Sequence, residues 1–183
     1  LTTSTLLTIQ SDIGENVARA IGQPYGAVFK QTADQIASKP TASLESYECV
    51  VKFRQRWRDY DQRDYDEMRG CLERTVAADP GYARAYASLA LLDIDTHRFG
   101  FGRDRIRIDP LQEARAFARH AIELDPDSTE GYLALSMAYW FSHDVEASIA
   151  AAERGLALDP HNTALLAQLG FRYAFLDTWD LGM

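Results

Sequence analysis

The sequence lacks the long apolar segments and repeated cysteines that mark several classes of protein. No apolar run approaches the ~18 residues that a transmembrane helix needs, so we expect no membrane insertion. No secretory signal peptide opens the chain, and because it starts at Leu1 rather than methionine we interpret it as an excised fragment. The two cysteines, Cys49 and Cys71, lack metal-ligand spacing. They are either two small buried side chains or a disulfide between neighbouring helices in an oxidising compartment.

The common catalytic and nucleotide-binding motifs are absent as well. No Gly-x-Ser-x-Gly elbow, Gly-Lys-Ser/Thr loop or His-Glu-x-x-His helix occurs in the sequence. The histidines are scattered along the chain, at His97, His120, His143 and His161. We therefore expect no catalytic residue, no cofactor and no bound metal in this fragment.

An excess of acidic residues argues against a nucleic-acid-binding protein. The net charge is −8 and the pI is near 4.9, whereas contacts with phosphates need a basic face. Hydrophobic residues make up 46% of the chain, enough to bury a core. The basic and aromatic stretch 52–60 is interpreted as an amphipathic core helix, because Phe53, Trp57 and Tyr60 fall on one helical face.

Three Asp-Pro pairs divide the chain into helical segments. They are Asp79–Pro80, Asp125–Pro126 and Asp159–Pro160, and each ends one helical pattern just before another begins. Proline has no amide hydrogen to donate and biases the preceding residue away from the α region, so a helix stops there. The last two prolines are 34 residues apart (126 to 160), and the first two are 46 apart (80 to 126).

Residues 129–162 show the repeating pattern most completely. Their first helix would carry large or apolar side chains, and their second helix small ones at Ser148 and Gly155, where two helices must cross closely. With its closing Pro160, this 34-residue unit resembles the tetratricopeptide repeat, although Ala152 stands where a large apolar residue is more usual. The resemblance implies an all-α fold, a right-handed superhelix of about three to four helix-turn-helix units. The first-helix positions of this unit are Tyr132, Leu135 and Tyr139.

The repeats are expected to fill residues 43–183. The predicted units are about 43–82, 83–128 with an inserted loop at 95–108, 129–162, and an incomplete unit at 163–183. In the second unit, Asp109 and Pro110 read as the N-cap and first position of a helix.

The inserted loop contains the sequence HRFGFGRDRIRID, which has two interpretations. It is either a solvent-facing loop whose phenylalanines tuck onto neighbouring helices, or a contact loop for an acidic partner. The candidate contact residues are Arg98, Phe99, Phe101, Arg103, Arg105 and Arg107.

The family's concave face supplies a second candidate surface, because first helices line that face in the repeat superhelix. It would be mostly apolar, which suits an amphipathic helix or another protein surface. Alternatively, later repeats cover it. Members of the family that bind chaperone tails use lysine and asparagine there, whereas Leu133 and Met137 occupy such positions here, so that ligand is not expected. The predicted concave residues are Arg84, Ala87, Leu91, Glu130, Leu133, Met137, Trp140, Ala167 and Phe171.

Residues 1–42 are interpreted as the remnant of a preceding domain and a linker. The order IQSDIGENVARAI, then KPTASLESYE, then repeats is similar to that of bacterial multidomain regulators with a TolB-amino-terminal-like module. Such parents carry a class III adenylate or guanylate cyclase or a winged-helix DNA-binding domain further upstream.

This resemblance implies a protein–protein interaction or regulatory module of a bacterial signalling protein, without catalysis of its own. The alternatives are the C-terminal part of a class III cyclase, or the sensory or dimerisation part of a transcriptional regulator. Its partner would be a protein, a peptide or another domain of the parent chain, with a homodimer as a further option. Cyclase-type parents imply a cytoplasmic location, and a membrane-anchored regulator a periplasmic one.

Overall fold

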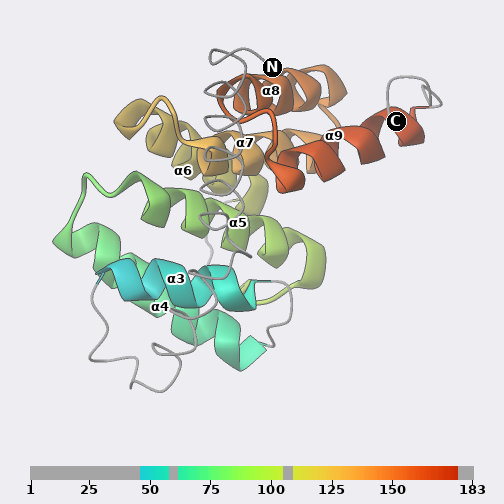
Figure 1. Cartoon of the computed structure of the whole chain (residues 1–183). Helices are drawn as coiled ribbons and strands as arrows, with labels where there is room; N and C mark the ends of the chain where they lie inside the picture. The colour runs from blue at the N-terminus through green and yellow to red at the C-terminus, as the bar shows by residue number, and fades with distance from the viewer. Residues whose placement is uncertain (1–45, 58–61, 105–108, 177–183) are drawn as a thin grey trace, which may run out of the picture. The chain divides into compact units, whose positions relative to one another are not determined.

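The structure, a computed structural model, describes residues 46–57, 62–104 and 109–176 (Figure 1). The described residues form seven α-helices and no strand, which confirms the predicted all-α fold. The chain divides into two compact units, Leu1–Asp59 and Tyr60–Met183, and each is considered by itself. The predictions for residues 1–42 lie outside the described residues.

The first unit contributes one described helix, α3 (Ser46–Arg56). Its buried side chains include Val50 and Phe53, and Trp57 follows the helix with its ring centroid 6.2 Å from that of Phe53. This is the amphipathic helix expected from the sequence, although Tyr60 lies outside the described residues. Cys49 in α3 and Cys71 in α4 (Gln62–Ala78) are both buried, and neither is a free thiol.

The second unit is a series of helices in which each packs on the next. The helices are α4 (Gln62–Ala78), α5 (Ala83–Phe99), α6 (Pro110–Leu124), α7 (Thr129–Phe141), α8 (Val145–Leu158) and α9 (Thr163–Phe175). In addition, α5 packs on α7, and α7 on α9 (Figure 1). The helices α5, α7 and α9 therefore lie next to one another in succession, as expected when helix pairs stack into an array.

The Asp-Pro pairs end helices α4, α6 and α8 as predicted. In each turn the aspartate Oδ1 accepts a hydrogen bond from the amide two residues later, at 3.1 to 3.2 Å. The same aspartate's carbonyl accepts from the amide three residues later. The following helix then starts at a capping side chain, such as Ser128 for α7 and Asn162 for α9. The predicted cap is also confirmed, since Asp109 accepts from Leu111 N with Pro110 at the first helical position.

Small residues sit where α7, α8 and α9 approach most closely, as predicted for Ser148 and Gly155. A Cβ added to Gly155 would lie 2.6 Å from Leu165 Cδ1, so only glycine fits there. Ser148 is fully buried, and its hydroxyl donates to the carbonyl of Ser136 while the Ser136 hydroxyl donates to the carbonyl of Ser148. The crossing of α7 and α8 is therefore both tight and hydrogen-bonded.

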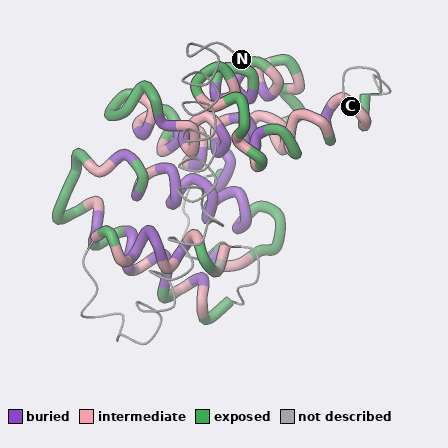
Figure 2. The backbone as a smooth tube through the Cα atoms, in the orientation of Figure 1, coloured by how far each residue is buried: buried purple, intermediate pink, exposed green. Residues whose placement is uncertain are grey.

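Helix α5 forms the centre of the second unit. Every residue from Ala87 to Thr96 is buried, and Figure 2 shows this helix as the longest buried stretch. It is buried around its circumference because α4, α6 and α7 all pack on it.

The buried face of α5 includes a polar network with α4. Arg69 donates to Asp93 and to Tyr65 Oη, and the Tyr65 hydroxyl lies 2.7 Å from Thr96 Oγ1. Burial raises the pKa of Asp93 to about 7, although Arg69 opposes that shift, and Asp93 Oδ2 has no hydrogen-bond partner. Sequence periodicity did not predict this network, since acidic residues inside an apolar run usually face solvent.

The inserted loop begins later than predicted. Helix α5 continues to Phe99, so residues 95–99 of the predicted 95–108 loop are helical. The helix ends because Gly100 adopts a left-handed conformation (φ 79°) and donates its amide to Thr96 O. Gly102 is buried against Tyr65, with its own positive φ of 61°.

Candidate interaction surface

The residues predicted for the concave face do not form one open surface. Ala87, Leu91, Leu133 and Met137 are buried and belong to the core. Glu130 and Trp140 are half-buried, whereas Arg84, Ala167 and Phe171 are exposed. The physical reason is that α5 and α7 each pack against several helices, so apolar side chains that periodicity assigned to a groove face a neighbour instead.

Exposed aromatic side chains gather where α7 and α9 meet. The ring of Trp140 lies 5.9 Å from that of Phe171 and 5.5 Å from that of Phe175, both in edge-on geometry. Phe171 is 57% exposed and Phe175 is 70% exposed. We call Trp140, Phe171 and Phe175 the aromatic face.

Local sequence explains how the aromatic face is built. Phe171 and Phe175 are four residues apart on α9, so they lie on one side of the helix with ring centroids 6.0 Å apart. Trp140 is in the last turn of α7, which packs on α9. The sequence predicted Trp140 and Phe171 but missed Phe175, which the same four-residue spacing would have found.

A buried arginine lies next to the aromatic face. Arg172 is fully buried, and its guanidinium carbon is 5.4 Å from the centre of the Trp140 ring. Its Nε donates to Ser148 Oγ at 2.6 Å and its Nη1 to Gln168 Oε1 at 3.2 Å, while Nη2 has no hydrogen-bond partner. Burial lowers the pKa of Arg172 to about 10.

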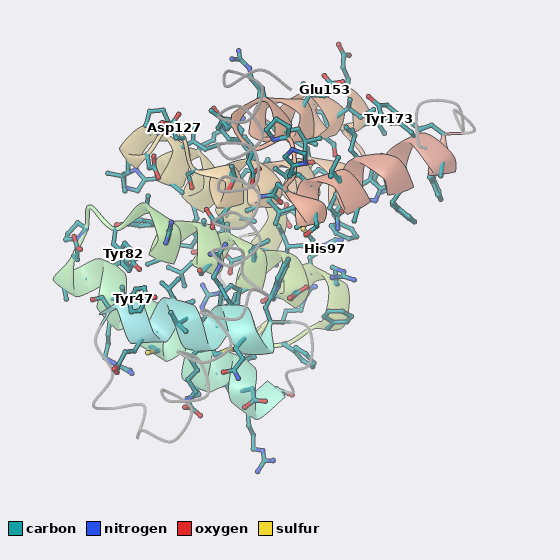
Figure 3. The ribbon with its side chains drawn as sticks, in the orientation of Figure 1. Tyr47, Tyr82, His97, Asp127, Glu153 and Tyr173 are labelled. Atoms are coloured by element: carbon teal, nitrogen blue, oxygen red, sulfur yellow. The ribbon has the colours of Figure 1, made fainter. Side chains whose placement is uncertain are left out.

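Sequence reasoning missed Arg172. The available signal was its place as the one charged residue in α9, whose sequence TALLAQLGFRYAF is otherwise apolar or neutral. Its neighbour Tyr173 points toward α8 instead, where its hydroxyl donates to Glu153 (Figure 3).

The second candidate surface, the inserted loop, brings three of its predicted residues together. The Arg98 guanidinium carbon lies 4.6 Å from the Phe99 ring centre and 5.4 Å from that of Phe141. The Phe99 and Phe101 rings are 5.7 Å apart, and the Phe101 ring is 6.3 Å from that of Tyr65. Phe101 therefore tucks onto α4, as the first interpretation predicted, whereas Phe99 stays 57% exposed.

The other predicted loop residues add little to this surface. Arg103 is exposed, and Arg105 and Arg107 lie outside the described residues. Arg98 is already paired with Asp95, at 3.1 Å. An acidic partner would have to compete with that carboxylate.

Neither a metal centre nor a membrane helix is found in the described part of the chain. No group of three or more His, Cys, Asp or Glu side chains there could hold a metal ion. None of the described helices is both long and apolar enough to cross a membrane.

No protein-family model matches the chain. The Hsp70-Hsp90 organizing protein of Triticum aestivum is 30% identical over 105 residues, which cover 57% of this chain and 16% of that protein. Putative adenylate cyclase 3 of Rhizobium meliloti is 25% identical over 133 residues, which cover 73% of this chain and 22% of that protein. The chain thus spans less than a quarter of the length of these curated relatives.

Solved structures of tetratricopeptide repeat domains share the fold. The first such domain of human RPAP3 has a TM-score of 0.55 at 19% identity, covering 74% of this chain and 94% of that one. A structure of the first such domain of Spaghetti (RPAP3) bound to the HSP90 peptide SRMEEVD has a TM-score of 0.54 at 20% identity, covering 73% and 94%. A crystal structure of MamA has a TM-score of 0.53 at 17% identity, covering 90% and 85%. The chain therefore has the tetratricopeptide repeat fold.

Proposed function

We propose that this chain is a protein-binding module and that its partner docks on the aromatic face. The observation that carries the proposal is the exposure of Phe171 and Phe175 beside Trp140. Contiguous exposed aromatic side chains mark interaction sites, because aromatic residues dominate the binding energy of protein interfaces. The described helices hold no group of three or more His, Cys, Asp or Glu side chains that could bind a metal ion.

The compared domains suggest what kind of partner this chain binds, but we do not propose that it binds the same peptides. The RPAP3 domain that resembles this fold binds an HSP90 peptide, which supports a peptide or protein as the kind of partner. However, Leu133 and Met137, which occupy two of the positions where such domains place lysine and asparagine, are buried here. Trp140 of the aromatic face lies three residues after Met137 on α7, and this surface offers aromatic rather than basic side chains.

The setting we propose is a bacterial multidomain signalling protein. The resemblance to Putative adenylate cyclase 3 favours the C-terminal region of a cyclase, with the sensory or dimerisation part of a transcriptional regulator as the alternative. The module itself would be non-catalytic. A cyclase parent would place it in the cytoplasm, whereas a membrane-anchored regulator would place it in the periplasm, where oxidised Cys49 and Cys71 would be stable. The reading frame upstream of Leu1 discriminates between these settings, since it encodes a cyclase, a winged helix or neither.

Peptide display tests whether the aromatic face binds a partner. A random-peptide library would be selected on the wild-type chain and counter-selected on the Phe171→Ser/Phe175→Ser double variant. Phe99→Ser is the matched control, because Phe99 and Phe171 are both 57% exposed but lie on different surfaces. We expect peptides that bind the wild type and the control but not the double variant. Peptides that bind all three proteins equally, or no enrichment at all, would overturn the proposal.

Self-association is the competing explanation for an exposed apolar face. Sedimentation of the wild type and the double variant over a range of concentrations separates the two. A wild-type dimer that the double variant loses would assign the face to a second copy of the chain. A monomer at all concentrations supports a different partner.

A further inference from the structure

The first helix of each repeat unit carries apolar residues at equivalent positions. The closing prolines Pro80, Pro126 and Pro160 are 46 and 34 residues apart, so a residue of α5 corresponds to the one 46 places later in α7, and that one to the residue 34 places later in α9. Three such positions lie about one helical turn apart, and we call them the stacking positions. They are Ala87, Leu91 and Ile94 in α5, Leu133, Met137 and Trp140 in α7, and Ala167, Phe171 and Ala174 in α9.

The stacking positions are buried in α5 and α7 but not in α9. In α5 all three residues are at most 5% exposed, and in α7 Leu133 and Met137 are at most 7% exposed. In α9, by contrast, Phe171 is 57% exposed and Ala167 is exposed as well. Helix α7 packs on α5 and α9 packs on α7, whereas no described first helix follows α9. Helix α9 therefore has the stacking positions of a first helix without a described helix to cover them.

The two interfaces between first helices show how one such helix covers another. The rings of Phe171 and Phe175 in α9 lie edge-on against Trp140 in α7. One unit earlier, Phe141 of α7, which is equivalent to Phe175, has its ring 6.0 Å from that of His97 in α5. In both pairs an aromatic side chain near the end of the later helix contacts the last turns of the earlier one. A helix along α9 would continue this series of interfaces.

The charge of α9 limits the chemistry of a partner. Of the described helices, α9 is the only one that contains no Asp or Glu, and its one charged residue, Arg172, is fully buried. Leu166 is 46% exposed, so apolar side chains reach the surface on more than the aromatic side of the helix. A helix that is apolar on several sides is normally covered by other elements. Because α9 offers no counter-charge, the surface that covers it must be uncharged too.

We infer that the partner supplies an amphipathic α-helix, which lies along α9 as α9 lies along α7 and places an uncharged apolar stripe on Ala167, Phe171 and Ala174. The inference rests on the proposed function and adds the secondary structure of the partner and the extent of the contact. Ala167 and Ala174 stand one turn before and one turn after Phe171. Their small side chains leave room for large apolar side chains of the partner helix on either side of the Phe171 ring.

Two peptide display libraries test whether the ligand is a helix. Both would randomise the same positions, spaced one helical turn apart on an alanine-rich framework, and the second library would carry a central proline that breaks the helix. Each would be selected on the full-length chain. We expect binders from the helical library alone, with apolar residues at the selected positions.

The variant Ala167→Glu then separates contact along α9 from contact with the aromatic rings alone. A selected helical peptide would carry a fluorescent label, and its affinity would be measured by anisotropy. We expect Ala167→Glu to weaken binding by at least about tenfold, because it places an unpaired charge beneath the bound helix. Ala150→Glu is the matched control, since Ala150 is an exposed alanine within α8 and the variant has the same charge. It should bind the peptide as the wild type does.

The outcomes separate this inference from the proposed function. Suppose that the proline library gives equally tight binders, or that Ala167→Glu binds as the wild type does, while Phe171→Ser/Phe175→Ser loses binding. The inference would then be overturned and the proposed function would stand. No binders from either library, or peptides that the double variant binds as well as the wild type does, would contradict both. A wild-type dimer in sedimentation that Ala167→Glu dissociates would overturn the inference in favour of a second copy of the chain.

Discussion

Ser136 and Ser148 hold α7 and α8 together through reciprocal hydrogen bonds. Each hydroxyl donates to the backbone carbonyl of the other residue, and both distances are 2.8 Å. The Ser148 hydroxyl also accepts from Arg172 Nε, so a single oxygen connects α7, α8 and α9. The small residues at this crossing therefore serve as hydrogen-bonding groups as well as allowing close approach.

Removing the two hydroxyls should have unequal effects. Ser136→Ala deletes one donor, and we expect it to lower the free energy of unfolding by about 1 kcal/mol. Ser148→Ala also deprives buried Arg172 of an acceptor, so we expect a loss of about 2 kcal/mol. Urea denaturation monitored by circular dichroism measures both. Equal losses would contradict the role of Ser148 as the acceptor for Arg172.

The start of the inserted loop should be structural rather than mobile. A Cβ at Gly102 would lie 2.1 Å from Tyr65 Cε1 at a φ of 61°, whereas a Cβ at Gly100 would meet nothing within 4 Å at a φ of 79°. We expect Gly100→Ala to destabilise the protein by about 1 kcal/mol through backbone strain alone. Gly102→Ala should lower the free energy of unfolding by at least about 2 kcal/mol more than Gly100→Ala does, because steric overlap adds to the backbone strain. Thermal or urea unfolding of the two variants measures this difference. Equal stabilities would mean that the loop does not pack against Tyr65.

The stability of the protein should fall as pH rises through neutrality. The pKa of Asp93 in the folded state, about 7, lies above the ordinary value of 3.8, so the folded chain binds this proton more tightly than the unfolded chain. The resulting stabilisation is complete below the ordinary pKa and is lost as pH rises through the folded-state value.

Asp93→Asn removes this titration while keeping a polar side chain. Between about pH 5 and about pH 8 we expect the wild type to lose about 2 kcal/mol more unfolding free energy than the variant. Urea denaturation at both pH values measures the difference. Parallel losses in the two proteins would show that Asp93 ionises at its ordinary pKa, paired with Arg69.

The cysteines should be oxidised in protein produced under oxidising conditions. Because neither Cys49 nor Cys71 is a free thiol, alkylation in denaturant should modify no residue before reduction and both residues afterwards. Mass spectrometry identifies which cysteines have been alkylated. Modification of both without reduction would restore the interpretation of two buried thiols.

Local chemistry made much of the fold predictable. Proline and the aspartate before it act on the nearest backbone groups, so the ends of α4, α6 and α8 could be predicted from the sequence, as could the capping of α6 by Asp109. The close approach of neighbouring helices at Gly155 could also be predicted, because glycine has no side chain to hold them apart. The end of α5 was placed too early, because residues 95–99 form another helical turn before Gly100.

The candidate surface was harder to predict because it depends on contacts between distant helices. Periodicity identifies an apolar face but not which neighbour covers it, so Leu91 and Met137 were assigned to a groove although they are buried. Arg172 was missed for a related reason. Its burial follows from packing against Ser148 and Trp140, which lie on other helices.

The most direct test of the proposed binding surface is whether the aromatic face is free or part of the core. The unfolding free energies of Phe171→Ser/Phe175→Ser and of Leu165→Ala would be compared, since Leu165 is fully buried on the same helix. For a free surface we expect a change within about 0.5 kcal/mol per substitution in the double variant, against a loss of about 2 to 5 kcal/mol for Leu165→Ala. If the double variant is destabilised as much as Leu165→Ala, the two phenylalanines belong to the core, and the aromatic face is not a binding surface.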